Sequence, residues 1–170
     1  RKLKTSPAKG NNYLFIAFSG EELGLYGSKY FTENPTIDLK AVNYMINMDM
    51  VGRLNDSTKV VTVGGYGTSP VWGSYYTSLA TQGKKQELQF RIDSSGTGPS
   101  DHTSFYRKDI PVLFYFTGLH RDYHKPTDTV DKIYWDLYEK RTRMIFHTAW
   151  EMANREEMLK RDTPLNMGMR

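Results

Sequence analysis

One short stretch constrains the fold of this chain more than any other: an apolar run that is followed at once by two glutamates. The run covers Tyr13 to Phe18 and predicts a buried strand over residues 13–19, because nearly every position is apolar. Gly20 ends the strand, and Glu21 and Glu22 come next, before a short helix expected over residues 24–31. In an open α/β sheet, ligands bind just beyond the carboxyl ends of strands. The pair therefore lies where such a fold places a site, although an acidic turn at a helix start is an alternative interpretation.

Strands and helices alternate along the rest of the chain. Apolar patterning predicts further strands over residues 41–50, 59–63, 87–92 and 110–116, and further helices over 69–80, 100–106 and 131–155. Since most of these strands are apolar on nearly every position, they are typical of a parallel or mixed sheet covered on both faces. The length of 170 residues fits a single domain, with a connector over 1–12, a folded core over 13–155 and a polar tail over 156–170 that we expect to fray.

Composition excludes several classes of function. The chain has no cysteine, so disulfides and thiolate metal ligands are excluded. The net charge of +4 is mild, and the basic residues form no stripe interleaved with aromatics, which argues against a nucleic-acid partner. No apolar run is long enough to predict a transmembrane segment. Because the chain does not begin with Met and shows no signal peptide, we expect a processed or truncated piece.

Carboxylates and histidines gather where the predicted strands end. Glu22, Asp49 and His124 follow three different strands, and carboxylate oxygens and a neutral imidazole are good ligands for zinc. Glu21 supplies a base beside them, as a site that activates a metal-bound water requires. The sequence has neither a Gly-x-Ser-x-Gly elbow nor a phosphate-binding P-loop, which argues against serine acyl chemistry and nucleotide hydrolysis.

Four motifs in register carry a resemblance to a known family. They cover residues 19–28 (SGEELGLYGS), 47–52 (NMDMVG), 100–105 (SDHTSF) and 123–129 (YHKPTDT). In order and spacing they resemble the co-catalytic di-zinc aminopeptidases, the family of bacterial leucyl aminopeptidase and aminopeptidase Y. The resemblance implies an α/β fold, a three-layer α/β/α sandwich around a mixed, mostly parallel sheet, of which this chain is the C-terminal portion.

The resemblance also implies roles for individual residues. Glu21 would be the general base, Glu22 and His124 would hold one zinc ion, and Asp49 would hold a second. In the family, the second zinc also needs an upstream His-x-Asp motif, which this chain lacks. Its only His-x-Asp is His120-Arg121-Asp122, and the place of that motif does not match.

Four further residues near the motifs are candidates for supporting the site or for contacting substrate: Asp101, His102, Tyr123 and His120. Asp101 also suits a helix N-cap or first turn, and His120 also suits an exposed loop. Arg53 flanks the second motif and could contact substrate as well.

The predicted function is that of a zinc-dependent aminopeptidase, in which a metal-activated water attacks the N-terminal peptide bond of a peptide with a free N-terminus. Two alternatives stay open: a glutaminyl cyclase-like single-zinc acyltransferase, and a non-catalytic receptor-like relative that binds a protein partner. We expect the fragment alone to be inactive, since the upstream ligands are missing, and to associate with itself through exposed apolar strand faces. A secreted or periplasmic location is an expectation that rests on the family resemblance only.

Overall fold

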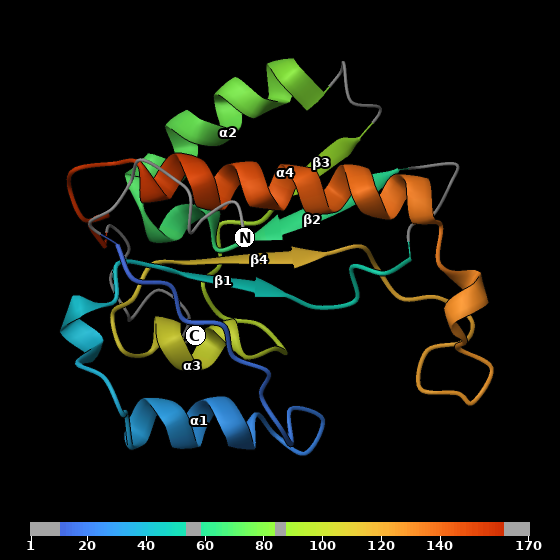
Figure 1. The fold of residues 1–170 in the computed structure, drawn as a ribbon, viewed down its shortest axis with the longest axis horizontal. Coiled ribbons are helices and arrows are strands. Elements are labelled where there is room, and N and C mark those ends of the chain that lie inside the picture. The colour runs from blue at the N-terminus through green and yellow to red at the C-terminus, as the bar shows by residue number, and fades with distance from the viewer. Residues whose placement is uncertain (1–10, 54–58, 84–87, 162–170) are drawn as a thin grey trace.

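A mixed four-stranded sheet forms the centre of the molecule. The computed structural model describes residues 11–53, 59–83 and 88–161 (Figure 1). Within them the strand order is β1-β4-β2-β3, where the strands are β1 (Met45–Met48), β4 (Val112–Phe116), β2 (Val60–Gly64) and β3 (Gln89–Ile92). The pairs β1–β4 and β2–β3 are parallel, and β2 runs antiparallel to β4. The predicted mixed, mostly parallel sheet is therefore confirmed.

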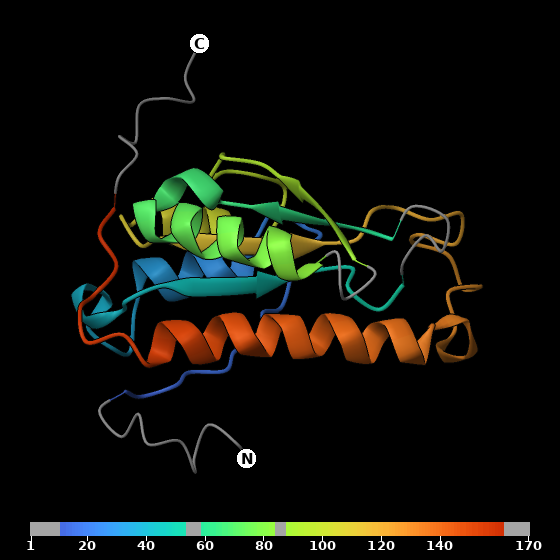
Figure 2. The same cartoon turned by 90° about the horizontal axis from the view of Figure 1, so that it is seen from above.

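Helices cover both faces of this sheet, as predicted for a three-layer α/β/α fold. Figures 1 and 2 show α1 and α3 on one side and α2 and α4 on the other. The helices are α1 (Tyr26–Glu33), α2 (Pro70–Gly83), α3 (His102–Tyr106) and α4 (Trp135–Ala153), with 3-10 turns η2 (Leu39–Ala41), η3 (Tyr66–Thr68) and η4 (Val130–Lys132). None of the helices in the described ranges combines the length and the apolar character needed to cross a bilayer.

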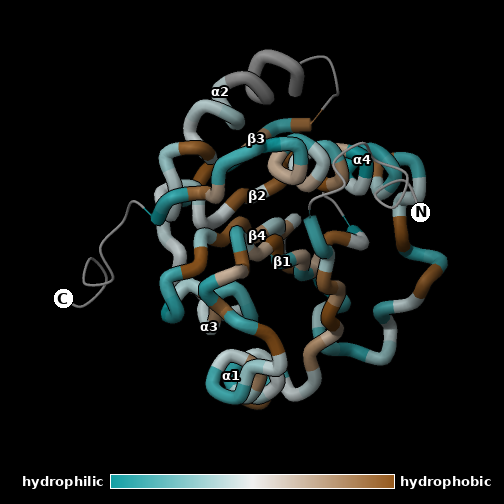
Figure 3. Tube along the Cα trace, turned by 60° about the vertical axis from the view of Figure 1, so that its left-hand side comes forward, coloured by the Kyte–Doolittle hydropathy of each residue, from teal (hydrophilic) through white to brown (hydrophobic). Residues whose placement is uncertain are grey.

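Strand β4 divides the hydrophobic interior into two cores, because successive side chains of a strand point to opposite faces. Val112 packs with Phe105 of α3 on one face. Leu113 and Tyr115 pack on the other face with α2 and α4, and all three of these β4 side chains are almost fully buried. Figure 3 shows hydrophobic segments on the strands and also on the loops around them.

The prediction of a buried strand over residues 13–19 is wrong for this structure. The segment has no strand pairing within the described residues, and Leu14 and Phe15 are 58% and 82% exposed. Phe18 does pack, with ring centroids 6.2 Å from Phe31 and 5.9 Å from Phe105. The physical reason is that a strand needs a neighbour for its backbone hydrogen bonds, and periodicity alone does not show whether that neighbour is present.

The first part of the C-terminal tail is packed rather than frayed. The Leu159 backbone N–H donates to Asn43 Oδ1 at 2.6 Å, and the Leu159 side chain is buried. The Arg161 guanidinium lies 3.8 Å from the centre of the Tyr106 ring. A cation above an aromatic face is attracted by the ring, so the tail is held against α3. Most of the predicted connector, residues 1–10, and the end of the tail, 162–170, lie outside the described residues.

His102 generates a prediction about pH. Its ring is 1% exposed and stacks on Phe114 with centroids 4.3 Å apart, and burial lowers its pKa to about 4. The unfolded chain therefore binds this proton near pH 6.5 and the folded chain only near pH 4. The contribution to stability is present above pH 6.5 and is lost as the pH falls towards 4, by at most about 3 kcal/mol.

Urea denaturation of the wild type and of His102→Gln measures this effect. We expect the difference in unfolding free energy between the two proteins to shrink as the pH is lowered from about 7 to about 4, because the variant has no proton to gain there. A difference that stays constant over this range would contradict the assignment.

Candidate functional site

The two glutamates lie on a tight turn that leads into α1. The backbone N–H groups of Gly24 and Leu25 both donate to the Glu21 carbonyl, at 3.0 and 2.9 Å. Leu25 adopts a left-handed backbone, with φ of 63°, immediately before the helix. Helix α1 begins at Tyr26 and has no acidic residue in its first turn, so the glutamates lie on the turn before the helix and not within it.

A glycine of α1 fixes the position of this turn. The Gly27 N–H donates to the Ser19 carbonyl at 2.9 Å, and a Cβ added at Gly27 would lie 2.5 Å from the same oxygen. The backbone just before the glutamates therefore lies directly against the helix. Any side chain at Gly27 would push the turn away.

Glu22 meets His124 although 102 residues separate them. The Glu22 Oε1 atom is 2.7 Å from His124 Nε2, and both side chains are more than half exposed. The Tyr123 ring stacks on the His124 ring with centroids 3.7 Å apart. Because an exposed ion pair adds little stability, this meeting is not explained by a need to hold the fold together.

Asp49 follows β1 and is held by a chain of buried polar groups. Its N–H donates to the Tyr115 carbonyl at 3.1 Å, which continues the β1–β4 pairing. The Ser100 hydroxyl donates to Asp49 Oδ2 at 3.0 Å and accepts from Asn47 Nδ2 at 2.8 Å. The chain fixes which way the Asp49 carboxylate points.

Negative charge accumulates at this edge of the sheet. Burial raises the pKa of Glu21, and the charges of Asp49, Glu22 and Asp101 raise that pKa further, while His124 lowers it. Carboxylates that repel one another favour a bound cation between them, because the ion relieves the repulsion. The electrostatics therefore fit a metal ion.

The donor set is nevertheless incomplete. Across the part of the chain that the structure describes, no three His, Asp or Glu side chains come close enough together to hold a metal ion. The Glu22–His124 pair offers two ligands, whereas a catalytic zinc usually has three from the protein. Carboxylate and imidazole groups are suitable ligands for zinc, and the negative charge of the carboxylates suits a cation. The residues present supply only part of the coordination sphere.

The remaining predicted residues lie in different surroundings. Asp101 is 8% exposed, burial raises its pKa, and its Oδ1 atom has no hydrogen-bond partner among the described residues. His102 is too deeply buried to contact a substrate, and its Nδ1 atom is 3.5 Å from Asn47 Nδ2. His120 lies on the loop of His124, and its Nε2 atom is 3.7 Å from Asp128 Oδ2.

An ionic cluster beside the site was not predicted from the sequence. Arg53 Nη1 donates to Asp122 Oδ2 at 2.8 Å and to Asp128 Oδ1 at 3.1 Å. From the sequence, Arg53 is a candidate for contacting substrate, and Asp122 is part of a His-x-Asp motif whose place does not match. The sequence does show that Arg53 follows the second motif and that Asp122, of opposite charge, precedes the fourth. No sequence pattern, however, predicts that these two side chains form an ion pair.

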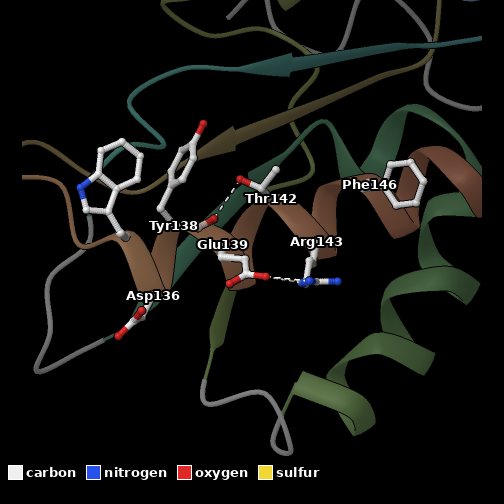
Figure 4. Close-up of a pocket in the computed structure, with 7 residues that line it drawn as sticks. Asp136, Tyr138, Glu139, Thr142, Arg143 and Phe146 are labelled. Atoms are coloured by element: carbon white, nitrogen blue, oxygen red, sulfur yellow. Dashed lines mark hydrogen bonds and ion pairs between the residues drawn. The ribbon is translucent and has the colours of Figure 1, made fainter. Parts of the chain in front are cut away.

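A surface hollow of about 580 Å³ lies on α4 (Figure 4). It is lined by Trp135, Asp136, Tyr138, Glu139, Thr142, Arg143 and Phe146. Glu139 and Arg143 form an ion pair one helical turn apart, at 2.7 Å. No residue predicted for the site lines this hollow, so it gives no evidence about the site.

The contact between Gly27 and Ser19 can be tested by substitution. Gly27→Ala should destabilise the protein and displace the glutamate turn, since the new methyl group would overlap the Ser19 carbonyl. Gly73→Ala in α2 is the matched control, because its Cβ would meet only the end of the Tyr66 side chain, at 3.2 Å. Thermal unfolding should show a lower midpoint for Gly27→Ala and an unchanged or higher midpoint for the control. Equal midpoints for both variants would contradict the close approach.

The sequence is similar to those of known peptidases. The sequence model of peptidase family M28 matches residues 1–149. Leupeptin-inactivating enzyme 1 of Streptomyces exfoliatus is 32% identical over 120 residues, which are 68% of this chain and 24% of that protein. Aminopeptidase YwaD of Bacillus subtilis is 26% identical over 170 residues, which are 94% of this chain and 36% of that protein. The chain thus spans only about a quarter to a third of the length of these relatives.

Solved structures show the same fold. The LapA aminopeptidase of Legionella pneumophila superimposes with a TM-score of 0.65 at 24% identity, covering 84% of this chain and 39% of LapA. BSAP, a zinc aminopeptidase of Bacillus subtilis, gives a TM-score of 0.66 at 24% identity, covering 88% of this chain and 39% of BSAP. Since the family model covers most of the sequence and the fold agrees, this chain belongs to peptidase family M28.

Proposed function

We propose that this chain is the C-terminal portion of a zinc-dependent aminopeptidase domain. The observation that carries the proposal is the meeting of Glu22 and His124 beside Glu21, at the edge of the sheet where Asp49 also lies. The family and the relatives named as aminopeptidases support the same activity. The substrate class is a peptide with a free N-terminus.

Each site residue has a distinct role in this proposal. Glu22 and His124 would hold one zinc ion, and Asp49 would hold a second. Zinc, when bound, would polarise the substrate carbonyl and lower the pKa of a water molecule. Glu21 is the general base: its carboxylate takes a proton from the attacking water and passes it to the leaving amine. The raised pKa of Glu21 suits a group that must both accept and release a proton.

In the whole domain, the activity would depend on ligands that this chain does not supply. The chain spans 36% of aminopeptidase YwaD, and its described residues place two ligands together rather than three. A second His and a bridging Asp would complete the two ions in the whole domain. The exposed Leu14 and Phe15 side chains support the further expectation that the 170-residue chain alone associates with itself.

The division of labour between the two glutamates is testable in the full-length protein. Glu21→Gln should retain zinc and lose turnover by on the order of a hundredfold to ten-thousandfold, because it removes the base and keeps the ligands. Glu22→Gln should instead weaken zinc binding, since an amide is a poorer ligand than a carboxylate. Metal analysis after dialysis, together with hydrolysis of an aminoacyl anilide, separates the two effects.

Glu33→Gln is the control for this pair, because Glu33 is exposed at the far end of α1. It should leave both zinc content and turnover unchanged. Equal zinc loss in Glu21→Gln and Glu22→Gln would contradict the assigned roles.

A further inference from the structure

The loop that carries His124 has little regular structure of its own. It runs from Thr117, just after β4, to Thr129, just before η4, and we call residues 117–129 the histidine loop. His124 has a φ of 57°, in the left-handed region that costs energy for a residue with a side chain. Its partner Glu22 is exposed, so their contact cannot hold the loop. Something else must fix where His124 lies.

Asp122 of the histidine loop is held by several side-chain contacts. It is 5% exposed, and its two carboxylate oxygens accept three hydrogen bonds. Arg53 Nη1 donates to Oδ2 at 2.8 Å, while Lys132 Nζ and Thr127 Oγ1 donate to Oδ1 at 3.0 and 2.8 Å. Both oxygens are therefore engaged by protein donors, which leaves Asp122 poorly placed to bind a metal itself.

Arg53 is fixed at both of its ends. Its guanidinium contacts Asp122 and Asp128, both on the histidine loop. Its backbone carbonyl accepts from the Thr117 hydroxyl, at the start of the same loop. Arg53 thus ties the segment after β1 to two parts of the histidine loop.

The segment after β1 is held from a third direction by α4. Arg141 is 1% exposed, and it donates to the carbonyls of Val51 and Gly52 at 3.1 Å each. These carbonyls lie between Asp49 and Arg53 along the chain. The backbone immediately before Arg53 is therefore held against α4.

We propose that Arg53 and Asp122 are positioning residues, which lock the two strand-end segments together and so fix His124 relative to Asp49. Arg53 lies four residues after Asp49, and Asp122 lies two residues before His124. This ion pair thus fixes the position of His124, proposed as a ligand of one zinc ion, relative to Asp49, proposed as a ligand of the other. This inference rests on the proposed function, because it assigns the pair to the zinc site.

The test uses the full-length protein and compares Asp122→Asn, Arg53→Met and the double variant. Asp122→Asn keeps the shape of the side chain but removes the charge that Arg53 and Lys132 require. We expect each single variant to weaken zinc binding roughly tenfold to a hundredfold, as substitutions beside metal ligands do. The double variant should bind zinc only slightly less tightly than the more impaired of the two single variants, because both changes break the same contact. Competition with a chelator measures the zinc affinity.

A second measurement does not depend on zinc. Hydrogen exchange of the metal-free protein should speed up in the histidine loop of Asp122→Asn and stay unchanged in α2. Arg121→Ala controls for local charge, since Arg121 is 87% exposed and 3.9 Å from Asp122. Asn43→Ala controls for general destabilisation, because it breaks the hydrogen bond to Leu159 at the amino-terminal side of β1.

The outcomes separate the two ideas. A wild type that binds no zinc would refute the proposed function. A wild type that binds zinc, with equal affinity in Asp122→Asn, would overturn the inference alone. Loss of zinc affinity in Asn43→Ala as large as in Asp122→Asn would also overturn it, since the effect would then reflect stability rather than positioning.

Discussion

The parallel pairing of β1 with β4 is the constraint on which the rest of the site depends. Met48 lies opposite Tyr115, and the backbone of Asp49 extends the ladder by one more hydrogen bond. Two parallel neighbours end at the same edge of a sheet. Asp49 and the histidine loop therefore emerge side by side, although about 70 residues separate them in the sequence. Without this pairing, neither the cluster of carboxylates nor the Arg53–Asp122 contact would form.

The two charged clusters at this edge differ in balance. In the first, burial and the negative charges of nearby carboxylates raise the pKa of Glu21, which is a costly arrangement unless a cation is bound. In the second, Arg53 and Lys132 hold the pKa of Asp122 well below its usual range, together with the Thr127 hydroxyl. A cluster with excess negative charge suits a catalytic site, whereas a cluster in which opposite charges pair suits holding neighbouring residues in place. The fold places them next to each other.

Sequence patterns identified elements whose cause is local. Helix α2 begins at Pro70, one residue after the start predicted for the helix over 69–80, because the fixed φ of proline suits a first helical position; the apolar run after Ile110 forms β4. Sequence patterns failed where a structure depends on residues far away in the sequence. The run from Tyr13 has strand character but no described strand pairs with it, and Arg141, a buried cation on the apolar face of α4, is explained only by carbonyls 90 and 89 residues away. The motifs located Glu22 and His124, but only the fold shows that they touch.

The polar chain from Asn47 through Ser100 to Asp49 has a direction. A serine hydroxyl has one hydrogen to give, and Ser100 gives it to Asp49 while receiving one from Asn47. Asn47 can only give through its amide nitrogen, so the sequence of donors cannot be reversed. Asp49 Oδ2 is thereby the acceptor that ends the chain. The other Asp49 oxygen, Oδ1, is the one that this chain of donors leaves unengaged at the edge of the sheet.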